Sequence, residues 1–386
     1  MPLKRIAHTT LAASCLFATH AWAGPDDATL RSIVDAAIRP MMAEYNLPGM
    51  AVGVTVNGKA TVFNYGVASK EHNLPVDGAT MFELGSVTKP ITATLVSYAQ
   101  VLGKLSLADH PSKYMPELEG APIDRATLLH LGTYTAGGLP LQFPDDVVDG
   151  RMASYFQQWK PSAPPGAQRR YSNPSLGLFG HLAALAMKRD FADLIENDLF
   201  AQLGMKNSYI RIPADAMANY AWGYDDANRP ARVKPGVLSP PSYGVVATAA
   251  DVLRLVEANL DPGKLAAPLR RAVEGTQVGY FAVGPMVQGL GWEQYRYPAR
   301  LQDVEARNSS AMSQKPNPSR KIASPKLPRH AVMFNKTGST RGFSNYVAFV
   351  PQMKIGVVML ANKYYPSEAR VKAALAILEQ VAPKGQ

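Results

Sequence analysis

The chain lacks the cysteines that a disulfide framework needs. Only one of its 386 residues is a cysteine, Cys15. It falls in an apolar run from about Thr9 to Trp22 that follows two basic residues and ends in Ala-Trp-Ala before Gly24, which is the pattern of a cleaved secretory signal. A chain cut after Ala23 has no thiol, so we expect its stability to come from the packed core alone.

Long hydrophobic runs are also missing. The run around Cys15 is too short to span a bilayer, and no other stretch approaches the ~18 apolar residues of a membrane helix. The sequence therefore predicts a signal peptide at 1–23, export to the periplasm and a mature form without a membrane anchor. A lipoprotein acylated on Cys15 is the weaker alternative, because Ala12 stands where a larger aliphatic side chain is wanted.

Several common catalytic signatures are absent. The seven histidines are scattered without the spacing of metal ligands. There is no Gly-x-Ser-x-Gly elbow, no P-loop and no dinucleotide fingerprint. A metallo-enzyme, an α/β-hydrolase and a nucleotide-dependent enzyme are therefore disfavoured, and we expect neither a metal nor a cofactor.

Positive charge is in excess, with a formal net charge of +10. The basic residues between Arg300 and Arg329 alternate with Pro, Ser and Asn rather than with aromatic residues, which favours a solvated loop over a nucleic-acid site. We expect no nucleic-acid partner. A modest positive field would instead attract a small carboxylate substrate.

Three short motifs carry the chemistry of the chain. They are Ser86-Val-Thr-Lys89, Tyr171-Ser-Asn173 and Lys336-Thr-Gly338, in that order. The first places a hydroxyl and an amine at i and i+3, on one face of a helix. A lysine kept neutral, or sharing its proton with a phenol, can then take the serine proton. Each motif alone is weak evidence, but their joint occurrence points to an activated serine nucleophile.

The local sequence predicts where these motifs lie. Pro90 fits only the first turn of a helix, so Ser86 should stand at a helix N-terminus, where backbone N–H groups stabilise an oxyanion. Tyr171 should lie in a loop before Pro174, as a proton shuttle with a pKa lowered by Lys89 and Lys336.

The third motif predicts a strand that forms one wall of the site. Gly338 allows close approach of the substrate. The N–H groups of Ser339 and Ser86 would form an oxyanion hole. Lys336 and Thr337 would bind a substrate carboxylate.

The pattern along the chain predicts an α+β fold. The stretch 50–62, with Asn57-Gly58 at its middle, predicts a hairpin, and strands are expected at 334–337, 346–350 and 354–360. Helices are expected at 91–102, 179–188, 191–203 and 368–381. We therefore expect an antiparallel sheet flanked by helices (24–102 and 186–386), a mostly helical domain (103–185) and an active site between them.

Through these motifs the chain resembles the class C serine β-lactamases, cephalosporinases of the penicillin-recognising superfamily. The resemblance extends over nearly the whole mature chain. It includes Phe82 to Gly85, Gly138 to Gln142, Asn173 to Gly180, Tyr220 to Tyr224, Tyr243 to Val245, Gly342 to Pro351 and Asn362-Lys363.

The resemblance implies a role for individual residues. Ser86 would be acylated and then deacylated, with Lys89 and Tyr171 sharing general base and acid duties. Gln142 and Asn173 would hold the amide side chain of the antibiotic, and Tyr243 would form an aromatic wall. The substrate would be a small β-lactam, and the enzyme is expected to be a monomer that confers antibiotic resistance.

Two positions depart from the family pattern. Arg341 follows the Lys-Thr-Gly-Ser-Thr run, as a second possible anion ligand, where the family often has a small or neutral residue. Ser367 precedes Glu-Ala-Arg370 where the family usually has Asn-Pro-Ala-Arg. Arg370 is kept as a substrate-binding residue, but the Asn that binds the substrate carboxylate is not, so we expect an altered substrate or inhibitor profile.

Fold alone does not separate this activity from its neighbours. A D-alanyl-D-alanine carboxypeptidase or penicillin-binding protein, and a carboxylesterase on the class C scaffold, would use the same acyl-serine step. A penicillin-binding sensor would form a stable acyl-enzyme without turnover. The resemblance outside the three motifs, at Gln142 and between Tyr220 and Val245, favours the β-lactamase.

Overall fold

A ten-stranded antiparallel sheet is the centre of the computed structural model, which describes residues 24–383. Its strands are β1 (Gly49–Val56), β2 (Lys59–Ser69), β3 (Leu74–Pro75), β10 (Phe281–Val283), β11 (Met286–Gln288), β12 (Glu293–Arg296), β14 (Arg320–Lys321), β15 (Val332–Ser339), β16 (Ser344–Val350) and β17 (Ile355–Ala361). Their order is β14-β10-β11-β12-β15-β16-β17-β1-β2-β3. The predicted signal peptide lies outside the described residues.

Both ends of the chain meet in this sheet, because β1 pairs with β17. The predicted hairpin is confirmed: Val56 pairs with Lys59 across Asn57-Gly58, and both turn residues have positive φ, as a type I′ turn requires. The three predicted C-terminal strands are β15, β16 and β17.

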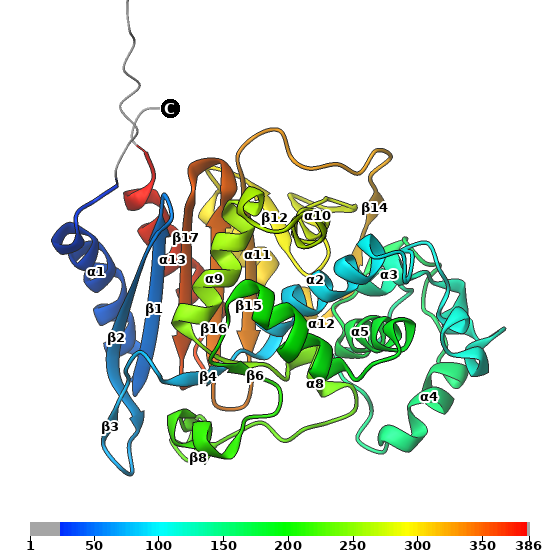
Figure 1. The fold of residues 1–386 in the computed structure, drawn as a ribbon, viewed down its shortest axis with the longest axis horizontal. Coiled ribbons are helices and arrows are strands. Elements are labelled where there is room, and N and C mark those ends of the chain that lie inside the picture. Colours follow the sequence, from blue (N-terminus) through cyan, green and yellow to red (C-terminus); the bar gives the residue numbers. More distant parts are fainter. Residues whose placement is uncertain (1–23, 384–386) are drawn as a thin grey trace, which may run out of the picture.

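Helices cover both faces of the sheet (Figure 1). On one face lie α1 (Asp27–Tyr45), α11 (Leu301–Asn308) and α13 (Ser367–Val381). The other face carries α2 (Thr88–Val101), α9 (Ala249–Leu260) and α10 (Ala267–Thr276). A Cβ on Gly53 would lie 2.6 Å from Leu253 Cδ1, so this glycine lets α9 approach the sheet closely.

A mostly helical part lies beside the sheet and has a core of its own. It contains the short 3-10 turns η2 (Pro111–Lys113), η3 (Pro116–Leu118), η4 (Pro122–Arg125) and η5 (Asp149–Arg151), with α3 (Leu128–Gly132), α4 (Met152–Gln158) and α5 (Asn173–Met187). The α+β class is thus confirmed, whereas the boundaries at 102/103 and 185/186 stay predictions.

The remaining elements connect these layers. Three small sheets pair β4 (Met81–Glu83) and β6 (Ser208–Tyr209) with β9 (Val246–Thr248), β5 (Gln168–Arg169) with β13 (Asn317–Pro318), and β7 (Gly223–Tyr224) with β8 (Pro230–Ala231). The helical pieces are α6 (Phe191–Asp193), the π-helix η6 (Leu194–Phe200), α7 (Ala201–Leu203), η7 (Ala214–Asn219), α8 (Ser239–Tyr243), η8 (Pro262–Lys264), α12 (Ser310–Gln314) and η9 (Pro351–Met353).

Two local expectations were wrong. The stretch 300–329 was expected to be a solvated loop, but it contains α11, α12, β13 and β14. Residues distant in sequence supply the partners of the two short strands. Asn173 was expected in a loop, yet it is the first residue of α5, which Ser172 caps through a hydrogen bond from the Ser175 N–H. Within residues 24–383, no helix combines the length and apolar character needed to cross a bilayer.

Candidate active site

Ser86 stands at the start of a helix, as Pro90 predicts. It is the middle residue of the 3-10 turn η1 (Gly85–Val87), which runs directly into α2. Gly85 precedes it with φ of +53°, and a Cβ at Gly85 would lie 2.8 Å from the backbone nitrogen of Ser339. The absence of a side chain here allows the turn that carries Ser86 to press against the end of β15.

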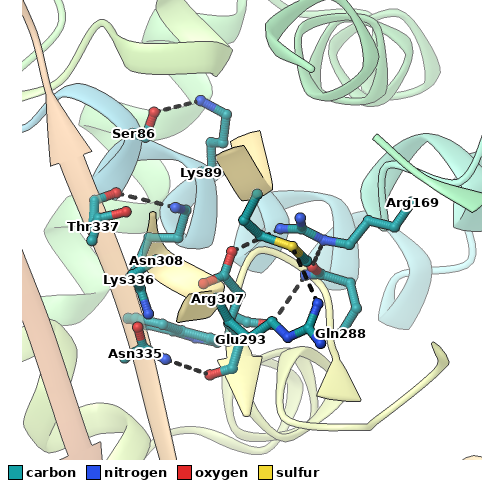
Figure 2. A network of polar contacts seen from close by, with 12 residues as sticks. Ser86, Lys89, Arg169, Gln288, Glu293, Arg307, Asn308, Asn335, Lys336 and Thr337 are labelled. Atoms are coloured by element: carbon teal, nitrogen blue, oxygen red, sulfur yellow. Dashed lines mark hydrogen bonds and ion pairs between the residues drawn. The ribbon is translucent and has the colours of Figure 1, made fainter. Parts of the chain in front are cut away.

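Lys89 lies one turn further along and points at the serine. Its Nζ donates to Ser86 Oγ at 2.9 Å and to the carbonyl of Ser242 at 2.8 Å, and Figure 2 shows the ammonium turned toward the hydroxyl. The side chain is fully buried. Burial lowers the pKa of Lys89 to about 8; the nearby Tyr171 opposes this shift, and the charge of Lys336 adds to it.

Tyr171 lies between two ammonium groups. Lys89 Nζ is 5.0 Å and Lys336 Nζ 4.9 Å from the centroid of its ring. Burial alone would raise the pKa of this phenol, but the charges of Lys336 and Lys89 outweigh it and bring the pKa down to about 8. The phenol and the Lys89 amine therefore titrate near the same pH and share protons as a group.

The wall formed by β15 carries the third motif. Lys336 donates from Nζ to the carbonyl of Thr337 at 3.1 Å. A Cβ on Gly338 would meet the carbonyl of Leu84 at 2.1 Å, so only glycine fits between this strand and the segment before the nucleophile. The N–H groups of Ser86 and Ser339 come from these two closely packed segments.

A cavity of about 400 Å³ opens at this junction of sheet and helices. Seven of the predicted residues line it: Ser86, Gln142, Tyr171, Asn173, Lys336, Thr337 and Ser339. Asn173 Nδ2 donates to Gln142 Oε1 at 2.9 Å, so these two amides are hydrogen-bonded to each other in the cavity wall. Among the described residues, no three His, Cys, Asp or Glu side chains gather in a way that could hold a metal ion.

The other predicted residues lie elsewhere. Arg370 is buried and donates to the backbone carbonyls of Gly338 and Tyr365 and to the hydroxyl of Ser339, and it is not among the residues that line the cavity. Tyr243 ends α8 and is likewise absent from the lining. Arg341 is exposed and lies 3.5 Å from Asp225.

One prominent ion pair of the site was not predicted by any local pattern. Arg169 and Glu293 both line the cavity, and Arg169 Nη2 lies 2.8 Å from Glu293 Oε1 in a buried ion pair. The two residues are separated by 124 positions, and neither belongs to a recognisable motif. Only the pairing of distant strands reveals them.

A serine hydroxyl that accepts a hydrogen bond from a buried lysine, beside a phenol with a lowered pKa, defines an acyl-transfer enzyme with a serine nucleophile. The comparisons with known proteins give the particular family. The β-lactamase family model matches residues 34–382. The chain therefore belongs to the β-lactamase family and, by its solved neighbours, to the class C serine hydrolases that act on β-lactams.

Three relatives illustrate the similarity. A β-lactamase of Pseudomonas fluorescens is 48% identical over 350 residues, which cover 90% of this chain and 98% of the relative. The solved D-alanine carboxypeptidase AmpC of Burkholderia cenocepacia is also 48% identical, with a TM-score of 0.88 and coverage of 92% and 99%. A class C β-lactamase in complex with cefoxitin is 43% identical, with a TM-score of 0.89 and coverage of 92% and 99%.

Proposed function

We propose that the chain hydrolyses cephalosporins and penicillins through an ester on Ser86. The proton of the Ser86 hydroxyl passes to the Lys89–Tyr171 group as Oγ attacks the lactam carbonyl. The C–N bond of the ring then breaks, and the ring nitrogen takes a proton from the same group. Water hydrolyses the ester and frees Ser86.

The single observation that carries this proposal is the contact between Ser86 and Lys89. At 2.9 Å the amine is within hydrogen-bonding distance of the hydroxyl whose proton must leave. Its full burial favours the neutral amine that a base must be. Tyr171 adds a second proton carrier that titrates in the same range.

The cavity supports roles for the residues around the ester. The N–H groups of Ser86 and Ser339 would bind the oxyanion. Lys336 and Thr337 would receive the substrate carboxylate, and Gln142 with Asn173 the amide side chain. We infer Arg370 to support Ser339 from behind, and Tyr243 to limit the outer edge of the substrate region.

We further propose export to the periplasm, after cleavage following Ala23. The support is the sequence pattern of 1–23 alone. N-terminal sequencing of the protein purified from the periplasm of an expressing bacterium checks it: Gly24 is the expected first residue, and a retained Met1 would contradict it.

Time-resolved intact mass and absorbance with a cephalosporin test the activity, in parallel with Ser86→Ala. Fast ring opening with a short-lived adduct is expected for the native chain and none for Ser86→Ala. Ser154 offers a matched control, because its hydroxyl donates to the carbonyl of Arg151 and it does not line the cavity, so Ser154→Ala should keep full turnover. An unchanged rate in Ser86→Ala would refute the nucleophile.

A D-alanyl-D-alanine carboxypeptidase activity is a second candidate. The observation in its favour is the 48% identity to the solved D-alanine carboxypeptidase AmpC of Burkholderia cenocepacia. Release of D-alanine from a peptide ending in D-Ala-D-Ala, measured on the same preparation, would establish it. An adduct with cephalosporin that persists for hours, without ring-opened product in solution, would favour a peptidase or sensor over the β-lactamase.

A further inference from the structure

Arg169 and Glu293 meet behind the reactive phenol. Arg169 ends β5, two residues before Tyr171, and Glu293 begins β12. The side chains of Arg169 and Glu293 are 1% and 5% exposed, and Nη2 lies 2.8 Å from Oε1. Arg169 Nε also donates to Gln288 Oε1 at 2.7 Å. Figure 2 shows Arg169 linked to Glu293 and Gln288 by these polar contacts.

Stability alone does not account for such a pair. Taking two charges out of water costs about as much as their attraction returns, and apolar side chains of similar volume are often as stable. The position of this ion pair at the edge of a reactive site therefore suggests a role other than stabilising the fold.

Two tyrosine rings lie on this guanidinium. Its carbon is 5.2 Å from the centroid of the Tyr134 ring and 5.7 Å from that of Tyr171, and the two rings are 4.8 Å apart. Cation–π attraction and ring packing are both short-ranged and directional. A guanidinium fixed by Glu293 and Gln288 thus limits where the Tyr171 ring can go.

The Arg169–Glu293 ion pair also affects the net charge around the Tyr171 phenol. Lys89 from α2, Lys336 from β15 and Arg169 from β5 lie over the Tyr171 ring, and the Tyr134 ring after α3 packs beside it. Glu293 from β12 is paired with Arg169. Of the other basic residues nearby, Arg170 is directed to the carbonyl of Gly138, and Arg307 of α11 to the sulfur of Met312. Glu293 is the carboxylate paired with Arg169, so it offsets the charge of this third cation.

We propose that Arg169 and Glu293 act as one positioning unit for Tyr171. The guanidinium supports the Tyr134–Tyr171 ring pair, and the carboxylate cancels its charge so that the two lysines govern the proton of the phenol. This inference rests on the proposed function, because it concerns the proton that Tyr171 carries there.

Opposite pH shifts are the signature of this unit. Glu293→Gln leaves a third cation beside the phenol, which lowers its pKa, so the acidic midpoint of kcat/KM should fall by about one pH unit. Arg169→Gln leaves a carboxylate instead, and the midpoint should rise by about the same amount. In Arg169→Gln/Glu293→Gln the two changes cancel, and the midpoint should return to within a few tenths of a unit.

The test is the pH profile of cephalosporin hydrolysis for the full chain and these three variants. Arg189→Gln is the matched control, because Arg189 pairs with Asp193 and Asp198 at the surface and should leave the profile unchanged. Midpoints that stay fixed, or that move in the same direction in both single variants, overturn the proposal.

Further variants distinguish failure of the positioning proposal from misfolding and from failure of the proposed function. Arg169→Lys serves as a second test should the single variants fail to fold. It keeps the charge but loses the planar fork of the guanidinium, so kcat should fall about tenfold with an unchanged pH midpoint. A native kcat in Arg169→Lys overturns the proposal. Tyr171→Phe reports on the function itself. If Tyr171→Phe keeps native turnover, the role of Tyr171 fails; if Tyr171→Phe is inactive while the charge variants keep the native profile, only the positioning unit fails.

Discussion

Arg370 Nη1 donates to the hydroxyl of Ser339 at 2.9 Å, and also to the carbonyl of Gly338 at 3.1 Å. The guanidinium is buried among backbone carbonyls, so its donors are used by the protein itself. These bonds anchor it to the end of β15, which packs against the turn that carries Ser86. We therefore infer that Arg370 supports β15, the strand that forms one wall of the site.

Arg370→Ala should therefore reduce kcat for every substrate. Several charge-assisted hydrogen bonds are lost from a buried site, so stability should fall by ~3 kcal/mol. Substrates with and without a carboxylate should be affected alike, which steady-state kinetics on a matched pair can measure. A loss restricted to KM of carboxylate substrates would instead make Arg370 a direct ligand.

Lys89→Arg should abolish most of the turnover. Arginine keeps the positive charge but cannot give up its proton. Loss of a general base costs on the order of 10²–10⁴ in rate, and kcat/KM for a cephalosporin should fall within that range. In the native chain, both Lys89 and Tyr171 have a pKa lowered to about 8, so activity should rise as the pH is raised through the group's midpoint. More than a tenth of native activity in Lys89→Arg would argue against a proton-accepting amine.

His130 should make stability depend on acid pH. Its Nδ1 accepts the N–H of Thr127 at 3.1 Å, which requires an unprotonated Nδ1. Burial, aided by the charges of Lys321 and His110, lowers the pKa of His130 to about 4. The unfolded chain, with an ordinary histidine pKa near 6.5, takes the proton first, so this contribution is lost as pH falls from about 6.5 to 4. Because the ring is partly exposed, we expect a loss of ~2 kcal/mol.

Urea unfolding between pH 7.5 and 4.5 measures this effect. His130→Gln should remove that part of the decline, whereas His72→Gln, at an exposed position, should keep it. Equal slopes in the native chain and His130→Gln would show that other groups cause the acid sensitivity.

Ser367→Asn addresses the departure from the family pattern. Ser367 is the first residue of α13 and lines the cavity, so an amide there adds a donor and an acceptor within reach of a substrate. We expect kcat/KM for cephalosporins to change several-fold, with a smaller effect on penicillins, because they differ in the ring that carries the carboxylate. Identical kinetics for the two forms with both substrate classes would end this hypothesis.

Local chemistry explains which parts of the fold are predictable from the sequence. Asn57-Gly58 forms its turn from its own backbone preferences, and Pro90 fixes the start of α2 in the same way. The positions of the three motifs are predictable because each lies in or beside an element with a clear sequence pattern. In contrast, β13 and β14 form only because β5 and β10 lie beside them.

The site shows the same division. Ser86, Lys89 and Tyr171 are predictable from short spacings and residue chemistry. Arg169 and Glu293 are not, since a pair joined across 124 positions leaves no local pattern in a single sequence. Arg341 was expected as an anion ligand beside Lys336, but the fold brings it next to Asp225.

The close glycine contacts beside the nucleophile determine the stage of folding at which activity first appears. Gly85 and Gly338 allow segments about 250 positions apart in sequence to touch with no room for a side chain. Ser86 and the proposed oxyanion donors thus come together only after β15 has docked, late in synthesis of the chain. Antibiotic hydrolysis should consequently serve as an assay of completed folding, silent in every truncated or half-folded form.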